Sequence, residues 1–155
     1  ANKLVFENAE MVVQVIGGPN RRTDFHDDPA DEFFSQLKGD MVLKLVEDSR
    51  VVDVPIREGE VFLARAHLRH SPQRPIAGSV GLVVEGARHA ERDGFEWYCF
   101  NCGSLVHRVE IALTNIVTDL PPLFETFYAD AAARTCRHCG TVHPGRVPPE
   151  DWVTI

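Results

Sequence analysis

The stretch Met41-Val-Leu-Lys-Leu-Val-Glu-Asp-Ser-Arg-Val-Val-Asp-Val-Pro-Ile-Arg-Glu-Gly59 decides the fold. It holds two short runs rich in β-branched and aliphatic residues, and each run is followed by residues that favour turns. Similar runs with similar turn residues occur on both sides, at residues 11–16, 33–37, 60–63 and 79–85. No helical periodicity competes between residues 11 and 85. The sequence therefore predicts an antiparallel β-sandwich or small barrel.

The second part of the chain has a different character. Strands are expected at residues 95–99 and 105–113, and a short helix is expected at residues 121–133, with Pro121 and Pro122 at its start. We expect residues 1–92 to form the barrel core and residues 93–155 to complete the sheet and carry a small subdomain.

Composition excludes several classes of protein. The 155 residues fit one domain with an ordinary core, and the hydrophobic content of 44% is typical of a globular chain. A net charge of −7 argues against nucleic acid as the main partner, because phosphate binding needs a basic face. No apolar run approaches membrane-spanning length and residues 1–6 have no signal-peptide layout, so no membrane partner and a cytoplasmic location are expected.

The four cysteines form two Cys-x-x-Cys pairs, Cys99/Cys102 and Cys136/Cys139. In a reducing compartment this spacing favours metal ligation by thiolates, with redox catalysis and disulfides as the alternatives. Four sulfur ligands suit zinc or a single iron and leave no open position, which indicates a structural site. The nearby histidines are interpreted as surface or hydrogen-bonded residues, namely His107, His138 and His143.

A second group of possible metal ligands comprises His26, Glu32 and His70. In a straight strand, six residues would separate His26 from Glu32 by about 20 Å. The intervening residues 27–31 form turns readily, so the chain can fold back and bring the two side chains together. Two imidazoles and one carboxylate leave positions open on a metal, as in non-haem Fe(II) enzymes. Each residue alone is more often a solvated histidine or a surface carboxylate.

Two arginines and a glutamate flank this group. Arg22 precedes His26 by four residues and Arg74 follows His70 by four, so both could line the same opening. A guanidinium grips a carboxylate or a reduced oxygen species with two parallel hydrogen bonds, although a surface ion pair is its more common fate. Strand alternation over residues 80–85 allows Glu85 to point into the barrel, and a surface position fits the pattern equally well.

These residues match the two cupin motifs. Glu32 followed by Gly39 fits the end of the first motif, and Gly59 followed by His70 fits the second. Asp28 stands where many cupins have a second histidine, which leaves a three-ligand set. Further departures occur in the second motif, at Arg65, His67 and Arg74.

Longer strings resemble the bacterial type of the 3-hydroxyanthranilate 3,4-dioxygenase family. The resemblance runs from Asn2 to about Arg146 and rests on the strings at residues 17–29, 69–75, 93–99, 105–110, 116–124 and 136–145. It implies an all-β fold, the cupin-type double-stranded β-helix or jelly-roll barrel, with a small C-terminal metal-binding subdomain containing a short helix.

The resemblance also implies roles for single residues. His26, Glu32 and His70 match the ligands of a catalytic Fe(II). Arg74 and Glu85 match residues that hold the substrate's carboxylate and its amino-phenol edge, with proton transfer assigned to Glu85. Arg22 and Asn2 match residues beside dioxygen. The remaining implied site is a rubredoxin-like iron, or a zinc, held by Cys99, Cys102, Cys136 and Cys139.

The implied reaction uses O2 to open the aromatic ring of 3-hydroxyanthranilate, which gives 2-amino-3-carboxymuconate semialdehyde. This product closes to quinolinate, so the chain would serve NAD biosynthesis or the degradation of tryptophan and other aromatics. The resemblance further implies a homodimer. Two alternatives stay open, a non-catalytic cupin that binds a small aromatic acid and another cupin metalloenzyme.

Overall fold

The computed structural model describes residues 2–155. Its elements are the strands β1 (Asn2–Leu4), β2 (Val12–Gly17), β3 (Phe25–Asp27), β4 (Glu32–Lys38), β5 (Met41–Glu47), β6 (Arg50–Ile56), β7 (Val61–Ala64), β8 (His70–Gln73), β9 (Val80–Glu85), β10 (Asp93–Tyr98) and β11 (Leu105–Ile111), the helices α1 (Ile116–Ala129) and α2 (Ala131–Arg134), and a 3-10 turn, η1 (Glu150–Trp152).

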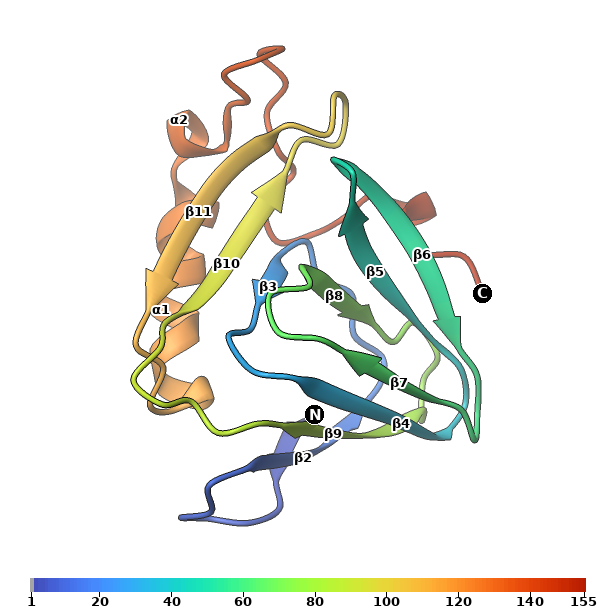
Figure 1. Ribbon diagram of the computed structural model, residues 1–155. Coiled ribbons are helices and arrows are strands. Elements are labelled where there is room, and N and C mark those ends of the chain that lie inside the picture. Colours follow the sequence, from blue (N-terminus) through green and yellow to red (C-terminus); the bar gives the residue numbers. More distant parts are fainter. Residues whose placement is uncertain (1) are drawn as a thin grey trace.

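The strands form two antiparallel sheets that enclose a barrel (Figure 1). One sheet has the order β1-β2-β9-β4-β7 and the other has the order β11-β10-β3-β8-β5-β6. Consecutive strands pair at β1-β2, β5-β6 and β10-β11, and the other neighbours come from distant parts of the chain, as in a jelly roll, where connections cross from one sheet to the other. The predicted fold class is therefore confirmed. β10 and β11 extend the second sheet, and the division of the chain at residue 93 stays a prediction.

The core lies between the two sheets. Its buried side chains come from both, with Phe34 and Val83 on one side and Met41, Leu43 and Leu45 on the other. Burying side chains of this size stabilises the fold by about 1.5–3 kcal/mol each. The β5–β6 hairpin has a two-residue turn at Asp48 and Ser49, both with positive φ, which matches the twist of paired strands. This turn lies at the turn-favouring residues 47–49, which follow the first run of the sequence.

Three strands were not foreseen, β1, β3 and β8. They are three or four residues long, too short for strand alternation to show in the sequence. β3 and β8 matter for function because they carry His26 and His70.

The predicted start of the helix was wrong. α1 begins five residues before Pro121, and the two prolines lie inside it. Asn115 caps the helix through its side chain, which accepts a hydrogen bond from the Val117 N–H, and Asp119 accepts from the Asn115 N–H. These polar caps satisfy backbone donors at the helix start and outweigh the loss of the two proline N–H groups. Within residues 2–155 no helix is long and apolar enough to span a bilayer.

α1 covers the outer face of β10 and β11 (Figure 1). Trp97 and Phe127 are the centre of this second core, and the His143 ring packs against Phe127 at a tilt of 56°. His143 is buried, and its Nδ1 accepts a hydrogen bond from the Gly145 N–H. Burial, together with the nearby charge of Arg134, lowers the pKa of His143 to about 4.

This lowered pKa predicts a loss of stability in weak acid. The unfolded chain takes up the proton near pH 6.5, whereas the folded chain resists it down to about pH 4, so stability falls as the pH drops through that window. At pH 5.5 the cost is about 1 kcal/mol. His143→Asn keeps an acceptor for the Gly145 N–H, and we expect it to lose this part of the pH dependence. Urea unfolding at pH 7.5 and 5.5 measures the free energy of unfolding of both proteins. If this free energy fell by the same amount in both between the two pH values, the assignment would be contradicted.

Candidate functional site

Two cross-strand pairs face each other inside the barrel. In one sheet His26 of β3 lies directly opposite His70 of β8, and in the other sheet Glu32 of β4 lies opposite Glu85 of β9. All four line a cavity of about 230 Å³. The turn predicted between His26 and Glu32 is present, and the Asp28 side chain closes it by accepting a hydrogen bond from the Ala30 N–H at 2.8 Å. This turn carries the chain from one sheet to the other.

Three of these side chains form a compact set of donor atoms. Oε2 of Glu32 lies 2.6 Å from Nε2 of His70 and 3.8 Å from Nδ1 of His26. Nδ1 of His70 is 2.8 Å from the Leu68 carbonyl oxygen, so an Nδ1–H donates there and Nε2 keeps its lone pair. Glu32 Oε2 and His70 Nε2 are both buried. The two atoms are close, but their geometry does not make a hydrogen bond. Converging lone pairs of this kind fit a divalent metal ion.

Burial by itself would raise the pKa of Glu32, but the surrounding positive groups outweigh it. His70 has the largest effect among them, followed by His26, and the pKa of the carboxyl lies below its usual range. Glu32 is therefore held as a carboxylate, the form in which it binds a metal.

His26 is also oriented from behind. Its Nε2 lies 2.8 Å from Oδ1 of Asp93, and its ring stacks on Phe95 with centroids 4.8 Å apart. A second possible metal set, with Asp28 and Asp93 around His26, is geometrically compact. Its carboxylates are already paired with the Arg88 guanidinium, so the set containing Glu32 and His70 fits an ion better.

Glu85 points into the barrel, on the side that strand alternation allowed. It is 5% exposed and accepts hydrogen bonds from Gln14 Nε2 at 2.9 Å and Arg88 Nη2 at 2.6 Å. Burial raises the pKa of Glu85 and the charge of Glu32 adds to this, whereas Arg88 opposes it. The balance leaves the pKa of Glu85 above its usual range, which suits a group that exchanges a proton with a ligand.

Arg74 is a buried cation that has no carboxylate in hydrogen-bond contact within the described part of the chain. It is 1% exposed, and its Nη1 donates to Gln36 Oε1 at 2.6 Å and lies 3.0 Å from Met41 Sδ. Its Nε is buried with no hydrogen-bond partner among the described residues. Burial lowers the pKa of Arg74 to about 10. Its guanidinium packs over Gly81, where a Cβ would come within 2.6–2.8 Å of it.

Arg22 and Asn2 lie at the rim of the same cavity. Arg22 forms an ion pair with Asp24, which it meets with both Nε and Nη2. Burial alone would lower the pKa of Arg22, but the Asp24 carboxylate raises it above its usual value. Asn2 is exposed on β1. The structure therefore brings the predicted metal ligands and the predicted substrate and dioxygen residues around one cavity, namely His26, Glu32, His70, Arg74, Glu85, Arg22 and Asn2.

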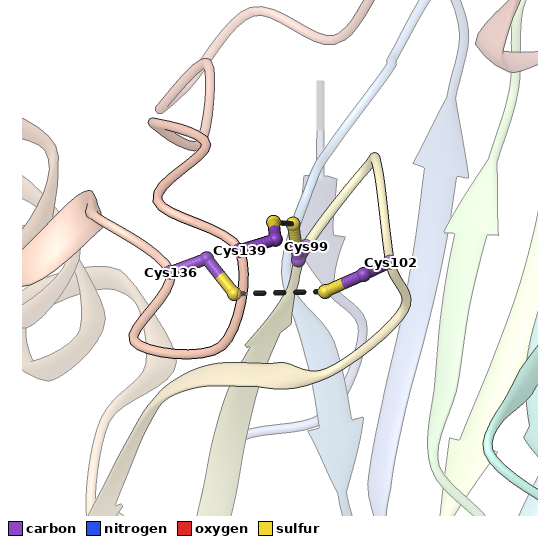
Figure 2. Close-up of side chains that lie close together, drawn as sticks. All are labelled: Cys99, Cys102, Cys136 and Cys139. Carbon is purple, nitrogen blue, oxygen red and sulfur yellow. Dashed lines mark hydrogen bonds between the residues drawn. The ribbon is translucent and has the colours of Figure 1, made fainter.

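The four cysteines converge about a second point, away from this cavity (Figure 2). Cys99 Sγ lies 3.6 Å from Cys139 Sγ, and Cys102 Sγ lies 3.6 Å from Cys136 Sγ, so the pairs are too far apart for disulfides. Each Cys-x-x-Cys pair is followed by a glycine of positive φ, Gly103 or Gly140. The N–H of this glycine donates to the carbonyl of the first cysteine of the pair. The matching turns present two sulfurs each, as a tetrahedral S₄ site requires.

Sequence reasoning missed the residues that support the site. Arg88 links Glu85 to Asp93, and Gln36 and Gly81 shape the seat of Arg74. Arg88 lies in a loop without periodicity, so its only signal was its position three residues after Glu85. Gly81 could have been noticed as a glycine inside a strand, a position where another group approaches the backbone closely.

Comparison with known proteins bears on this geometry. A family model described as 3-hydroxyanthranilic acid dioxygenase matches residues 1–128. A relative named 3-hydroxyanthranilate 3,4-dioxygenase from Jannaschia sp. (strain CCS1) is 63% identical over 155 residues, covering 99% of this chain and 86% of its own length. The protein of that name from Ruegeria pomeroyi is 60% identical with the same coverage. Among solved structures, an RmlC-like cupin from Shewanella frigidimarina is 13% identical with a TM-score of 0.45, covering 57% of this chain and 76% of its own. The chain belongs to the 3-hydroxyanthranilic acid dioxygenase family.

Proposed function

We propose that this chain is an Fe(II)-dependent dioxygenase that opens the ring of 3-hydroxyanthranilate with O2 to give 2-amino-3-carboxymuconate semialdehyde. One observation carries the proposal: a compact set of two histidines and a carboxylate shares its cavity with a buried arginine that hydrogen-bonds to no carboxylate among residues 2–155. The substrate that the relatives' name specifies is an aromatic acid, and its carboxylate is the partner that Arg74 lacks.

His26, Glu32 and His70 would hold the iron, with Asp93 and the Leu68 carbonyl orienting the two imidazoles. Bound iron would supply a centre on which both substrates meet and through which electrons pass between them. Three protein ligands leave room for a substrate that binds through its hydroxyl and amine and for O2. The chain's own task is then to orient the ring, manage protons and stabilise charge.

Three further side chains divide that task. Arg74 would bind the carboxylate and thereby fix the direction of the ring. Glu85 faces Glu32 across the strand pair and would take a proton from the amino-phenol edge, in keeping with its raised pKa. Arg22, with Asn2 at the rim, would stabilise negative charge that develops on oxygen.

The four-cysteine site would hold a second metal, iron or zinc, in a structural role. We further propose a homodimer in the cytoplasm. Both a biosynthetic and a degradative pathway fit this reaction.

The first prediction concerns the reaction itself. Protein loaded with Fe(II) should consume O2 and form the ring-opened chromophore when 3-hydroxyanthranilate is added. His70→Ala removes a metal ligand, and we expect it to lower the rate at least about 100-fold. His138→Ala, an exposed histidine away from the cavity, is the control and should keep full activity.

If His70→Ala kept its activity, the assigned metal site would be wrong. Tight binding of the aromatic acid without oxygen uptake would instead favour a non-catalytic cupin. Metal-dependent turnover of other substrates alone would favour another cupin metalloenzyme.

The second prediction concerns the carboxylate. Arg74→Met keeps the shape of the side chain and removes its charge. We expect kcat/KM for 3-hydroxyanthranilate to fall about 100-fold, the value of a buried charge-assisted pair, while kcat/KM for 2-aminophenol, which lacks the carboxylate, changes little. Steady-state kinetics with both substrates measure this change of preference.

Two glycines offer a matched test of the same contact. Gly81→Ala should displace the Arg74 guanidinium and raise the KM for 3-hydroxyanthranilate about tenfold. Gly94→Ala crowds the guanidinium of Arg108 in the same way, but behind β3 and outside the cavity, so it should not change the preference between 3-hydroxyanthranilate and 2-aminophenol, whereas Gly81→Ala should. Equal effects of the two variants would contradict the role of Arg74.

The third prediction concerns the cysteines. Cys136→Ser should remove the second metal and lower the thermal midpoint, because the C-terminal chain loses its attachment to Cys99 and Cys102. Metal analysis before and after the substitution measures the loss. A full metal complement in Cys136→Ser would contradict the S₄ assignment.

A further inference from the structure

The loop that carries Arg22 is held from two distant parts of the chain. The Arg22 carbonyl oxygen accepts one hydrogen bond from Gln73 Nε2 at 2.9 Å and another from the indole N–H of Trp152 at 3.1 Å. The Arg22 N–H donates to Gln73 Oε1 at 3.1 Å. Both backbone polar groups of Arg22 are thus bound to side chains, and one of those side chains lies 130 residues away.

Trp152 is itself fixed by its surroundings. Its ring lies 4.5 Å from that of Phe100, and Nζ of the buried Lys44 lies 4.0 Å from its centroid. Phe25, three residues after Arg22, meets the same ring edge-on at 6.4 Å. An aromatic side chain packed on several sides presents its N–H in one direction, and here that direction is the Arg22 carbonyl.

The chain that leads to Trp152 starts at the cysteine site and is held by hydrogen bonds along its way. After Cys136 and Cys139 the chain returns to α2, where the His143 N–H donates to the Arg134 carbonyl at 2.8 Å and Arg134 Nη1 donates to the His143 carbonyl at 2.7 Å. Thr23 then donates its hydroxyl to the Gly145 carbonyl at 2.6 Å. Figure 1 shows this C-terminal chain, in red, running from α2 across to the side of β5 and β6.

We propose that Trp152 is a positioning residue for Arg22, and that the C-terminal segment 143–152 transmits the order of the four-cysteine site to the rim of the active cavity. This inference rests on the proposed function. It concerns a segment beyond residue 128, where the match to the family model ends. The indole N–H and Gln73 together fix the backbone of Arg22, so its guanidinium keeps one position beside Asp24, in the cavity that the proposed metal ligands also line.

A double-mutant cycle tests the coupling. Trp152→Phe removes the N–H and keeps most of the ring, and we expect it to lower kcat/KM about fivefold, the value of one hydrogen bond. Arg22→Ala should cost about 100-fold, as expected for a cation that stabilises developing charge. Because Trp152 acts through Arg22, the double variant should be no slower than Arg22→Ala alone.

The other tryptophan provides the control. Trp97→Phe makes the same substitution in the core beneath α1, where the ring neighbours include Phe124, Phe127 and His107. Trp97→Phe should lower kcat/KM by the same factor in the unsubstituted protein and in Arg22→Ala. If the losses of kcat/KM caused by Trp152→Phe and Arg22→Ala multiplied in the double variant, the proposal would be overturned.

Hydrogen exchange gives a readout that does not depend on turnover. Trp152→Phe should speed amide exchange in a peptide covering residues 20–25, because the Arg22 carbonyl loses one of its two hydrogen bonds, whereas Trp97→Phe should not. The same measurement on Cys136→Ser tests transmission from the metal site. Unchanged exchange at residues 20–25 in Trp152→Phe would overturn the proposal even if no dioxygenase activity were found, and changed exchange in an inactive protein would refute only the proposed function.

Discussion

The structure depends on one constraint, the register of two strand pairs. His26 and His70 are direct cross-strand neighbours in one sheet, and Glu32 and Glu85 are direct neighbours in the other. A shift of one residue in either pair would turn these side chains to the outside, because strand side chains alternate between faces. The same register places Phe95 beside His26 and Leu45 beside His70, so one row across the sheet supports both imidazoles. Apolar neighbours on each side fix the rings without competing for their nitrogen atoms.

Charge is distributed unevenly around the cavity. On the side of His26, Arg88 lies among three carboxylates, Asp28, Glu85 and Asp93, and its single positive charge compensates theirs only in part, so this side stays negative. At Arg74, by contrast, the side-chain hydrogen-bond partners within residues 2–155 are an amide oxygen and a thioether sulfur. A buried cation without an anion costs several kcal/mol, which a ligand carboxylate can offset on binding. The cavity therefore selects an anionic ligand and also selects its direction, with the carboxylate toward Arg74 and the other polar groups toward Glu32 and Glu85.

Sequence reasoning reached the parts that local patterns control. The fold class followed from regular turns, the approach of Glu32 to His26 followed from the turn residues between them, and the inward direction of Glu85 was one of two readings of strand alternation. β3 and β8 were missed because such short strands form only through pairing with partners that are distant in sequence. The start of α1 was placed too late because the prolines outweighed the caps at Asn115 and Asp119. Contacts such as Trp152 with Arg22 leave no local signal, since neither residue's neighbours in sequence predict the other.

The shortness of β3 explains why so much of the chain converges on it. β3 has three residues, which all pair with β10, but among the described residues it meets β8 at only one pair, His26 with His70, so it is fixed weakly on that side. Ion pairs on the outer face of β3 hold the strand in addition. Asp27 is paired with Arg69 at 3.1 Å and with Arg108 at 2.9 Å, directly behind the side that faces the metal ligands. Gly94 lies opposite Asp27 and leaves the space that the Arg108 guanidinium occupies. On the N-terminal side, Trp152 and Gln73 hold the residues that lead into the strand. The barrel therefore keeps a polar centre at His26 because β3, which carries His26, is fixed from two sides. The ion pairs of Asp27 hold the strand from behind, and Trp152 near the end of the chain holds the residues that lead into it.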